Sequence, residues 1–487
     1  MKVSVFTCTP QFENDLMDAV RIFIGSAETL SQEEGGDMTL RHTEEVTGNT
    51  RICRVDITGQ YSGSATRQEV ILSDPLLDKR MHKRQLKNCA YEVMKKATFF
   101  HPPWGSLTGI RPTRLLYMDL QKGHTLEEAR ANLMRSFDTQ SEKADLLCDV
   151  VRTQQTLPDQ KDGEIDLYIG IPFCVSRCAY CSFLSGEVGN GKMLPPYVEA
   201  LKKEIDAVTR LVDQYGLKPR AFYMGGGTPT SLSAPMMQEV LSAAQPLLKK
   251  CREITVEAGR PDTIDEDKLR VIFDAGTHRI SVNPQTMHDE TLERIGRKHT
   301  CRQTEEAYRL ARKVGFKDIN MDLIAGLPGE NSAMFRKTLD WLSGLDPESM
   351  TVHTLCIKRS SLLHLWEHVL PSGDMVADMV RMGREEAKRK GMQPYYLYRQ
   401  KYMAGNLENV GYALPGCESL YNIGMMEETA NVLAMGAGAI SKRVNVESGF
   451  IRRAPNVSNI EQYIERVDEM IERKQVLLLE TMNAERN

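Results

Sequence analysis

The sequence predicts an α/β fold built around a partial (β/α)6 barrel, with a small α+β domain before the barrel and a C-terminal α+β region that covers its substrate side. Three observations predict this arrangement. Strand-like and helical segments alternate six times from residue 165 onward. Stretches rich in proline and glycine separate this region from the residues before it. The pattern then becomes mixed after residue 370.

Residues 1–100 are expected to form the small α+β domain, and nothing in them indicates a chemical role. Strands are predicted at 2–8, 39–42, 51–58 and 67–72. Helical spacing of apolar residues predicts helices at 15–24 and 77–98, the second of which contains no glycine or proline. Residues 101–160 are expected to be a helical connector, which begins in the Pro- and Gly-rich stretch around Trp104.

Residues 161–370 carry the alternating pattern. The predicted strands are 165–171, 221–224, 253–257, 279–282, 318–324 and 350–355. Helical segments lie between them, for example at 196–215, 235–248 and 335–345. Six units rather than eight predict an open or partial barrel, and sites in such folds lie at the carboxyl ends of the strands.

Residues 371–487 are the predicted C-terminal region. It should contain a helix at 374–390, a strand at 395–403, a glycine-rich strand end at 436–441 and a last helix at 460–477. Side chains alternate along a strand, which places Tyr396, Tyr398, Gln400 and Tyr402 on one face of the strand at 395–403. Arg399 and Lys401 would then point to the other face.

The composition excludes some classes of function. A net charge of −4 over 487 residues gives no global field that would attract nucleic acid or an anionic membrane. No apolar run is long enough to cross a bilayer, and the N-terminus lacks the long apolar centre of a signal peptide. We therefore expect a cytoplasmic protein with no nucleic-acid partner and no membrane span.

Three of the 11 cysteines lie within eight residues, directly after the first barrel strand. Cys174, Cys178 and Cys181 have the spacing Cys-x3-Cys-x2-Cys. Such a loop can bind three irons of a cubane cluster and leave the fourth iron open to a chelating ligand. The alternative is a zinc site, but zinc favours four ligands in paired Cys-x2-Cys units, and this chain has no second pair.

The cysteine motif and its surroundings resemble the radical S-adenosylmethionine (SAM) superfamily. Tyr168 lies in the usual lead-in, Leu167-Tyr-Ile-Gly-Ile-Pro-Phe173, and Tyr180 has the position of the aromatic residue that packs on adenine. The resemblance implies a TIM-like partial barrel, a [4Fe–4S] cluster on the three cysteines, and SAM as the second cofactor. One electron from the cluster into the sulfonium would give a 5′-deoxyadenosyl radical.

Further residues match positions that contact SAM in this superfamily. The implied set is Tyr168, Tyr180, Gly225, Gly226, Gly227, Thr228, Glu257, Gln285, Arg297 and Asp322. The glycine-rich loop after the second strand is implied to bind the methionine amino group, since glycine lets the backbone approach a ligand. Glu257 is implied to bind the ribose hydroxyls, and a surface salt bridge is the alternative. For the remaining strand-end polar residues, helix capping is the alternative. No side chain is assigned a catalytic role.

Within the superfamily, the sequence resembles oxygen-independent coproporphyrinogen III oxidases (dehydrogenases). The matching segments are Gly225–Thr230, Ile295–His299, Asp322–Gly329 and Tyr398–Tyr412, and the Trp104–Thr113 connector resembles a subgroup with a long N-terminal extension. The resemblance implies oxidative decarboxylation of two propionates of coproporphyrinogen III to give protoporphyrinogen IX in haem biosynthesis. An electron donor such as flavodoxin or ferredoxin is implied as a partner. The tyrosine face of the strand at 395–403 would suit a flat tetrapyrrole, and Arg399 or Lys401 its carboxylates; ordinary strand packing is the alternative.

Two departures from the family pattern keep alternatives open. Ser182-Phe183 stands where the best-known oxidases carry a fourth cysteine. The haem-chaperone relatives carry His-Asn-x-x-Tyr-Trp where this chain has Tyr421-Asn-Ile-Gly-Met-Met426, so the haem-binding signature is absent. The first hypothesis is the oxidase. A haem or tetrapyrrole carrier is the second, and another radical reaction on a tetrapyrrole, such as methyl transfer or ring opening, is the third.

Overall fold

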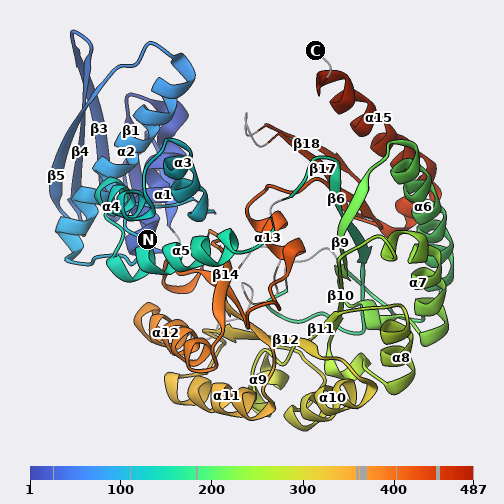
Figure 1. Ribbon diagram of the computed structural model, residues 1–487. Helices are drawn as coiled ribbons and strands as arrows, with labels where there is room; N and C mark the ends of the chain where they lie inside the picture. Colours follow the sequence, from blue (N-terminus) through green and yellow to red (C-terminus); the bar gives the residue numbers. More distant parts are fainter. Residues whose placement is uncertain are drawn as a thin grey trace. The chain divides into compact units, whose positions relative to one another are not determined.

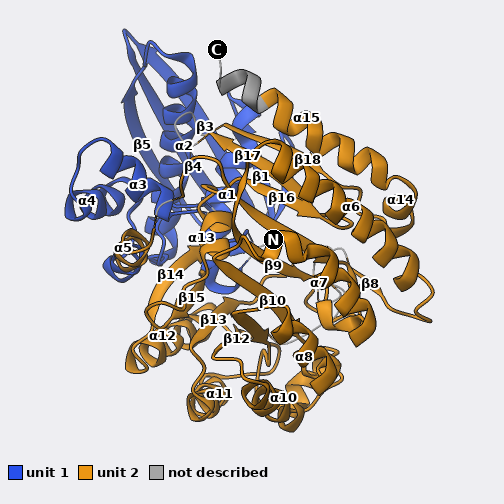
Figure 2. Ribbon diagram, turned by 45° about the vertical axis from the view of Figure 1, so that its right-hand side comes forward, with its two compact units in different colours: residues 1–148, 399–407 blue, residues 149–398, 408–487 orange. Residues whose placement is uncertain are grey.

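The structure is a computed structural model that describes residues 1–25, 27–109, 111–158, 160–181, 185–357, 361, 363, 370–401, 403–445 and 450–485. The chain divides into two compact units (Figure 2). Unit 1 comprises Met1–Cys148 and Arg399–Leu407, and unit 2 comprises Asp149–Tyr398 and Glu408–Asn487. A search of the helices in these described ranges finds none long and apolar enough to cross a membrane.

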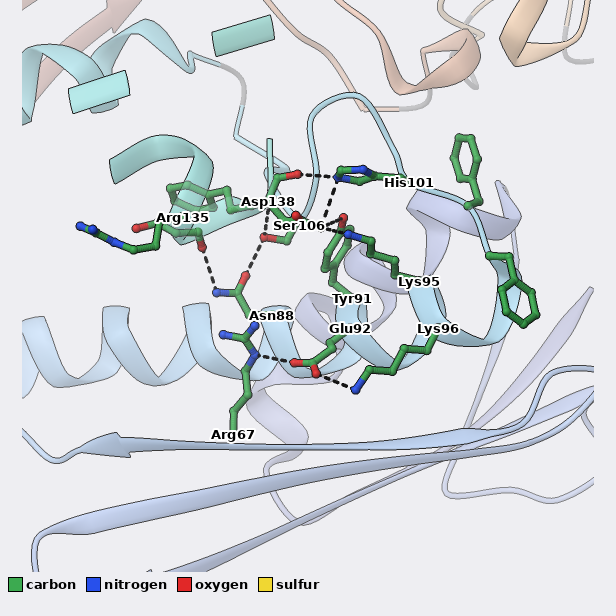
Figure 3. Close-up of a pocket in the computed structure, with 14 residues that line it drawn as sticks. Arg67, Asn88, Tyr91, Glu92, Lys95, Lys96, His101, Ser106, Arg135 and Asp138 are labelled. Carbon is green, nitrogen blue, oxygen red and sulfur yellow. Dashed lines mark hydrogen bonds and ion pairs between the residues drawn. The ribbon is translucent and has the colours of Figure 1, made fainter. Parts of the chain in front are cut away.

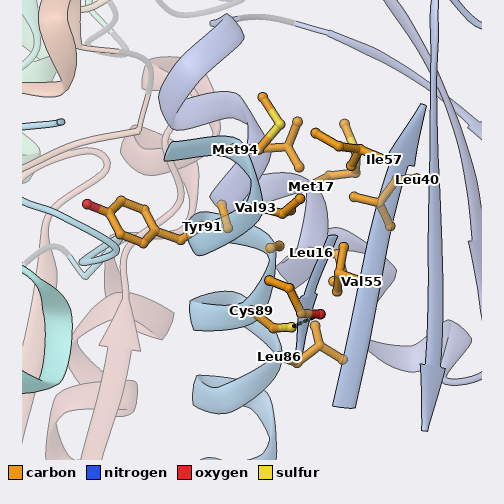
Figure 4. Packing of buried hydrophobic residues seen from close by; sticks show 14 of the residues in the cluster. Leu16, Met17, Leu40, Val55, Ile57, Leu86, Cys89, Tyr91, Val93 and Met94 are labelled. Carbon is orange, nitrogen blue, oxygen red and sulfur yellow. Dashed lines mark hydrogen bonds between the residues drawn. The ribbon is translucent and has the colours of Figure 1, made fainter. Parts of the chain in front are cut away.

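A five-stranded sheet in the order β2-β1-β3-β4-β5 forms the centre of unit 1. β1 (Lys2–Thr7) pairs in parallel with β2 (Glu28–Ser31) and β3 (Met38–Thr47). β3, β4 (Thr50–Gly59) and β5 (Gly63–Val70) are antiparallel. The helices α1 (Glu13–Ile24) and α2 (Pro75–Thr98) share one apolar core with this sheet (Figure 4). The prediction of a small N-terminal α+β domain is therefore confirmed.

Three further helices follow in sequence, namely α3 (Thr113–Gln121), α4 (Leu126–Phe137) and α5 (Ser141–Gln155). A cavity of about 670 Å³ lies between the end of α2 and the end of α4 (Figure 3). Its polar lining is largely paired within itself: Tyr91 donates to Asp138 at 2.7 Å, and Arg67 to Glu92 at 3.0 Å. The polar side chains of this cavity are therefore explained by their bonds to one another.

Unit 2 contains the predicted barrel. Its parallel strands are β6 (Glu164–Ile171), β9 (Lys218–Gly226), β10 (Glu253–Gly259), β11 (Arg279–Val282), β12 (Asp318–Ala325) and β13 (Ser349–Thr354). Helices cover the outside of the barrel (Figure 1): α6 (Leu194–Gln214), α7 (Ala234–Leu248), α8 (Glu266–Asp274), α9 (Asp289–Arg294), α10 (Cys301–Val314) and α11 (Ser332–Leu345). The α/β class and the partial barrel are therefore confirmed, and every predicted strand from 165 to 355 overlaps an observed one.

Side-chain caps determine where four of these helices begin. Ser233, Asp265, Thr300 and Asn331 each accept a hydrogen bond from the backbone N–H three residues later. Three of these caps lie in the connection between a barrel strand and the following helix, and Thr300 lies between α9 and α10. The caps therefore limit the length of the loops that carry the strand ends.

The C-terminal segment extends the barrel sheet at both ends. β15 (Asn409–Ala413) pairs antiparallel with β13 and with β14 (Gln393–Tyr398). β16 (Val432–Met435) lies parallel to β6 and continues through β17 (Ile440–Asn445) to β18 (Phe450–Pro455). The remaining helices are α12 (Gly373–Arg389), α13 (Leu420–Met426), α14 (Ile460–Glu465) and α15 (Val467–Glu485). The single last helix predicted at 460–477 is thus divided at Arg466.

The prediction of one strand through 395–403 was wrong in its second half. β14 ends at Tyr398, and residues 399–407 belong to unit 1. The buried Arg399 guanidinium donates to the carbonyl of Leu107 and to that of Asn406 at 2.9 Å, and it lies over the Trp104 ring. Lys401 pairs with Asp18 at 2.9 Å. Because both cations are used inside unit 1, we no longer expect either to bind a substrate carboxylate; Tyr402 lies outside the described residues.

Candidate functional site

Five neighbouring strands bring the predicted cofactor residues to one edge of the sheet. Cys174 follows β6, Gly225 lies at the end of β9, and Glu257 lies near the end of β10. Gln285 follows β11, and Asp322 lies on β12. These strands are adjacent in the order β6-β9-β10-β11-β12, and all are parallel. The site therefore lies at the carboxyl ends of the strands, where barrels of this kind carry their chemistry.

Cys174 is closely packed against the glycine-rich loop. Its Sγ lies 3.5 Å from the Thr228 hydroxyl and 3.7 Å from that of Ser185. The Thr228 N–H donates to the carbonyl of Phe173 at 2.8 Å, which holds the loop against the residue before the cysteine. A Cβ on Gly227 would lie 2.6 Å from that carbonyl oxygen and 3.0 Å from Cys174 Sγ. Glycine is therefore required at 227 by the thiol and its backbone.

Two buried arginines lie beside Cys178. Arg260 Nη1 is 3.6 Å from Cys178 Sγ, and the same guanidinium donates to Asp262 at 2.7 and 3.0 Å. Arg297 donates to the carbonyl of Asn283, while its Nε has no hydrogen-bond partner among the described residues. Buried cations next to thiols suit ligands that bind a metal as thiolates. Arg260 was not among the predicted site residues; its spacing from Asp262 predicts a local ion pair but not the contact with Cys178.

Tyr180 lies at the base of the cysteine loop. It packs against a small apolar cluster that consists of Ala179, Leu292, Ile295, Ile324, Leu327, Leu355 and Leu363. Burial raises its phenol pKa, so the ring is neutral at physiological pH. The Cys181 N–H donates to the Cys178 carbonyl at 3.1 Å, which closes a tight turn around the tyrosine. Ser182 and Phe183, where the family pattern is broken, lie outside the described residues.

The glycine-rich loop also contacts Glu257. A Cβ on Gly225 would lie 2.8 Å from the Tyr223 ring and 2.9 Å from Glu257 Oε2. Tyr223 donates its hydroxyl to Glu257 Oε1 at 2.5 Å. Burial, together with the charge of nearby Asp322, raises the pKa of Glu257 to about 7. Glu257 is therefore enclosed in the site, so the surface salt bridge considered for it does not occur.

A backbone hydrogen bond links Gln285, which follows β11, to Asp322 on β12. Burial acts to raise the pKa of Asp322, but the nearby His353 imidazole and a hydrogen bond from Asn320 hold it below its usual range. Asn320 donates to Asp322 at 2.8 Å, and His353 Nε2 lies 3.6 Å from the carboxylate. Gln285 has a φ of 67° and donates its backbone N–H to the Asp322 carbonyl at 2.9 Å. A left-handed conformation in a residue other than glycine is often found at functional sites.

A stack of tyrosines lies beside Glu257. The Tyr223 and Tyr421 rings are 4.6 Å apart at 18°, and Tyr168 lies nearly parallel to both at 6.4 and 6.1 Å. Tyr168 comes from β6, Tyr223 from β9 and Tyr421 from α13. Tyr421 and Tyr223 were not predicted as site residues. Positions 168, 223 and 421 are too far apart in the sequence for any local pattern to connect them.

These residues fit the cofactors of a radical SAM site. The chain provides three thiols in one loop, a cation against one of them, and a glycine whose missing side chain accommodates another. A carboxylate that can accept two hydrogen bonds lies two strands away. Such a set can bind a [4Fe–4S] cluster next to a ligand that carries an amino group and a ribose.

The chain is similar to several known proteins. The family model described as the radical SAM superfamily matches residues 168–342. The chain is 39% identical over 434 residues to the oxygen-independent coproporphyrinogen-III oxidase-like protein HemZ of Bacillus subtilis, which covers 86% of this chain and 87% of that protein. It is 31% identical over 295 residues to the heme chaperone HemW of Escherichia coli, and the match covers 59% of this chain and 72% of that protein. The solved structure of coproporphyrinogen III oxidase (HemN) of Escherichia coli matches with a TM-score of 0.50 at 22% identity, over 63% of this chain and 70% of that one, and shows the same fold.

Proposed function

Because this chain belongs to the radical SAM superfamily, in the group of oxygen-independent coproporphyrinogen III oxidase-like proteins, we propose that it is a radical SAM oxidoreductase acting on a tetrapyrrole. Its cofactors are those of the family, a [4Fe–4S] cluster and SAM. We propose coproporphyrinogen III as the substrate and protoporphyrinogen IX as the product. The electron donor would be a cytoplasmic protein such as flavodoxin or ferredoxin.

In this proposal Cys174, Cys178 and Cys181 hold the cluster. When bound, the cluster and SAM would together supply a 5′-deoxyadenosyl radical. The backbone at Gly225–Thr228 receives the amino end of SAM, and Glu257 accepts hydrogen bonds from its ribose hydroxyls. Gln285, Arg297 and Asp322 line the same pocket, and Tyr180 supports the adenine side. Arg260 balances the negative charge of the thiolates at Cys178.

One observation carries the assignment of the pocket. Gly225 and Gly227 lie in the same short loop. A Cβ added to Gly227 would lie 3.0 Å from Cys174 Sγ, and one added to Gly225 would lie 2.9 Å from Glu257 Oε2. A ligand that binds this loop therefore lies between the cluster thiols and a carboxylate. A molecule with a chelating amino acid at one end and a ribose at the other matches that spacing of functions.

The proposed reaction removes one hydrogen atom from the β-carbon of a propionate. That hydrogen atom would leave in 5′-deoxyadenosine. Loss of CO2 from the substrate radical, with one electron passing to an external one-electron acceptor, would then leave a vinyl group, so each propionic acid group loses CO2, one hydrogen atom and one proton. The tyrosines around Tyr223 offer an aromatic wall to a flat macrocycle. The relatives named as coproporphyrinogen oxidases support this choice of substrate.

The haem-chaperone relatives make a tetrapyrrole carrier the second candidate. Residues Tyr421–Met426 stand where those relatives carry the haem-binding signature, and here their side chains pack inside the protein. Tyr421 is stacked on Tyr223 at 4.6 Å, and burial raises its pKa well above the usual value, which keeps it a neutral phenol. Met425 packs against the buried cluster of Val432, Ala434 and Ala439, and Met426 against the cluster around Tyr395. A neutral phenol is a poor iron ligand, and both thioethers have packing roles, so we favour the enzyme.

The test is anaerobic incubation of cluster-loaded protein with coproporphyrinogen III, SAM and a reductant, followed by mass analysis. We expect 5′-deoxyadenosine and products lighter by one and then two units of CO2 plus two hydrogens. The Cys178→Ala variant should give neither. Tight haem binding, without any stimulation of SAM cleavage by coproporphyrinogen III, would instead establish the carrier. Cleavage stimulated by haem alone would indicate another radical reaction on the macrocycle.

A further inference from the structure

Unit 1 contains a group of metal-ligand side chains that the proposed function does not use. Cys8, His42 and Glu44 each offer one ligand atom, and these atoms all lie within 4.8 Å of one another. His82 lies next to them, with its Nε2 at 2.5 Å from Glu44 Oε1. Among the described residues, this is the only such group found by that distance criterion.

The fold brings the four residues together from three elements. Cys8 directly follows β1, and β1 pairs in parallel with β3 so that Thr7 lies opposite His42. On β3 the inward face runs from the buried Met38 and Leu40 to His42 and then to Glu44. His82 comes from α2, on the side of that helix that carries Leu86 and Cys89 against the sheet (Figure 4). Polar side chains thus continue a face that elsewhere forms the apolar core.

One ring nitrogen of His42 faces Glu44 without making a hydrogen bond to a described residue. Its side chain is completely buried, and Nδ1 lies 2.9 Å from the Thr7 hydroxyl. Nε2 lies 3.2 Å from Glu44 Oε1 but has no hydrogen-bond partner in the described part of the chain. A buried nitrogen without a partner is unfavourable. A bound cation would remove this cost, with Thr7 holding the other ring nitrogen as outer-shell groups do in metal sites.

We propose that Cys8, His42 and Glu44 bind one divalent transition-metal ion of the zinc class, with His82 fixing the Glu44 carboxylate. Zinc accepts sulfur, nitrogen and oxygen ligands at about 2.0–2.3 Å, which in a tetrahedron places ligand atoms about 3.3–3.8 Å apart. The ligand atoms now lie within 4.8 Å of one another, so the group must close by about 1 Å, and the Cys8 thiol, now 3.7 Å from His42 Nδ1, must turn toward the ion at Nε2. Cys8 gives up its thiol proton on binding, and the thiolate and the carboxylate balance the charge of the ion.

A nucleophile of the Cys-His-Glu type would use the same residue types. The Thr7 hydroxyl lies closer to His42 Nδ1, at 2.9 Å, than the thiol of Cys8, at 3.7 Å. The imidazole is therefore already engaged on the side where it would need to take the thiol proton. Cys8 is exposed, which leaves the remaining coordination position of the ion open to water or to an added ligand.

The test uses full-length protein with its cluster in place. Anaerobic protein is treated with a mild chelator and titrated with Zn²⁺ against a chromophoric competitor, and zinc and iron are measured in the same samples. We expect one tightly bound zinc per chain in addition to about four irons. His82→Gln should weaken zinc binding about 10–100-fold, as loss of outer-shell groups does, and Cys8→Ser and His42→Gln at least as much.

Matched variants separate this site from other thiols and imidazoles. Cys251→Ser and His124→Gln should bind zinc as the wild type does. Cys8 is exposed, so Cys8→Ser should fold normally, and zinc should raise the melting temperature of the wild type but not of this variant. Undiminished zinc binding by both Cys8→Ser and His42→Gln overturns the proposal, and so does zinc that is lost only when Cys174 is replaced. This inference does not depend on the proposed function, since cluster iron and zinc are counted separately.

Discussion

Tyr223 donates its hydroxyl to Glu257 Oε1 at 2.5 Å, and this bond determines which part of the carboxylate is left for a ligand. Glu257 Oε2 faces Gly225, where an added Cβ would lie 2.9 Å from the oxygen. The carboxylate thus has one oxygen held by the protein and a second beside the loop proposed to receive SAM. Its protonation state should therefore control the affinity for SAM.

We predict that SAM binding weakens as the pH falls through about 7. Burial and then the charge of Asp322 raise the pKa of Glu257 from 4.5 to about 7, so the carboxylate gains a proton below that pH and loses acceptor strength. Between pH 8 and pH 6 the affinity should fall up to about tenfold, in proportion to the ionised fraction. Calorimetric titration of cluster-loaded protein with SAM across this range measures the effect.

Glu257→Gln should remove that pH dependence and weaken binding by about 1–3 kcal/mol, while the iron content stays unchanged. Glu348→Gln is a suitable control, because Glu348 pairs with Arg312 at the opposite end of the strands. Without SAM, Glu257→Gln should stabilise the protein above pH 7. A carboxyl group whose pKa is raised in the native state makes that state lose stability as the pH rises from 4.5 to 7, and the glutamine removes this loss. An equal pH slope in Glu257→Gln and the wild type would show that another group titrates.

Gly227→Ala should prevent assembly of the cluster. The added Cβ would lie 2.6 Å from the Phe173 carbonyl oxygen and 3.0 Å from Cys174 Sγ, so Cys174 must move. Iron and sulfide per chain should fall severalfold after anaerobic reconstitution. Gly344→Ala is the matched control, because nothing lies within 4 Å of its added Cβ on the outer helix α11. Full iron loading of Gly227→Ala would mean that Cys174 is not held in the described position.

Lys474→Met should destabilise the protein strongly. Lys474 on α15 and Glu204 on α6 form a completely buried ion pair at 2.6 Å, and Tyr463 also donates to Glu204 at 2.6 Å. Removal of the lysine leaves a buried carboxylate without its cation, which costs about 3–5 kcal/mol. Hydrogen exchange of α6 and α15, together with thermal melting, measures the loss. Lys203→Met, which removes an exposed pair with Asp468, should change stability by less than about 0.5 kcal/mol.

The sequence predicted correctly those features of the structure that depend on a local pattern of residues. The strand expected at 253–257 is observed as β10 over Glu253–Gly259, because this short segment is rich in β-branched residues, which favour strands. The cysteine spacing and the glycine-rich loop are likewise local, which is why their positions at the strand ends could be anticipated. The start predicted at 235 lies one residue from the observed start of α7 at Ala234, whereas α11 begins at Ser332, three residues before its predicted start.

The missed features all depend on contacts between distant residues. Arg399 fits an alternating strand, yet it leaves that pattern because its guanidinium is buried against the carbonyl of Leu107, 292 positions earlier. Tyr421 reaches Tyr223 only because α13, which follows β14 and β15 in the sequence, packs beside β9. His42 and Glu44 resemble surface residues in the sequence, and only the pairing of β1 with β3 places them beside Cys8.

Arg260→Met should lower the reduction potential of the cluster. Arg260 Nη1 lies 3.6 Å from Cys178 Sγ, and Asp262 holds the guanidinium in place through contacts of 2.7 and 3.0 Å. A cation and a hydrogen bond at a ligand sulfur stabilise the reduced cluster, which carries one more negative charge. A hydrogen bond to a charged group is worth about 1.5–3 kcal/mol, and 59 mV corresponds to about 1.4 kcal/mol for one electron, so we expect a decrease of up to about 60–130 mV. Arg260→Lys, which keeps the charge but not the planar fork, should shift the potential less. Potentiometric titration followed by electron paramagnetic resonance measures the three proteins, with Arg270→Met as an exposed control. The Arg260 guanidinium also donates to the Ser176 carbonyl at 3.1 Å. Equal potentials in Arg260→Met and the wild type would mean that Arg260 only anchors the loop around Ser176.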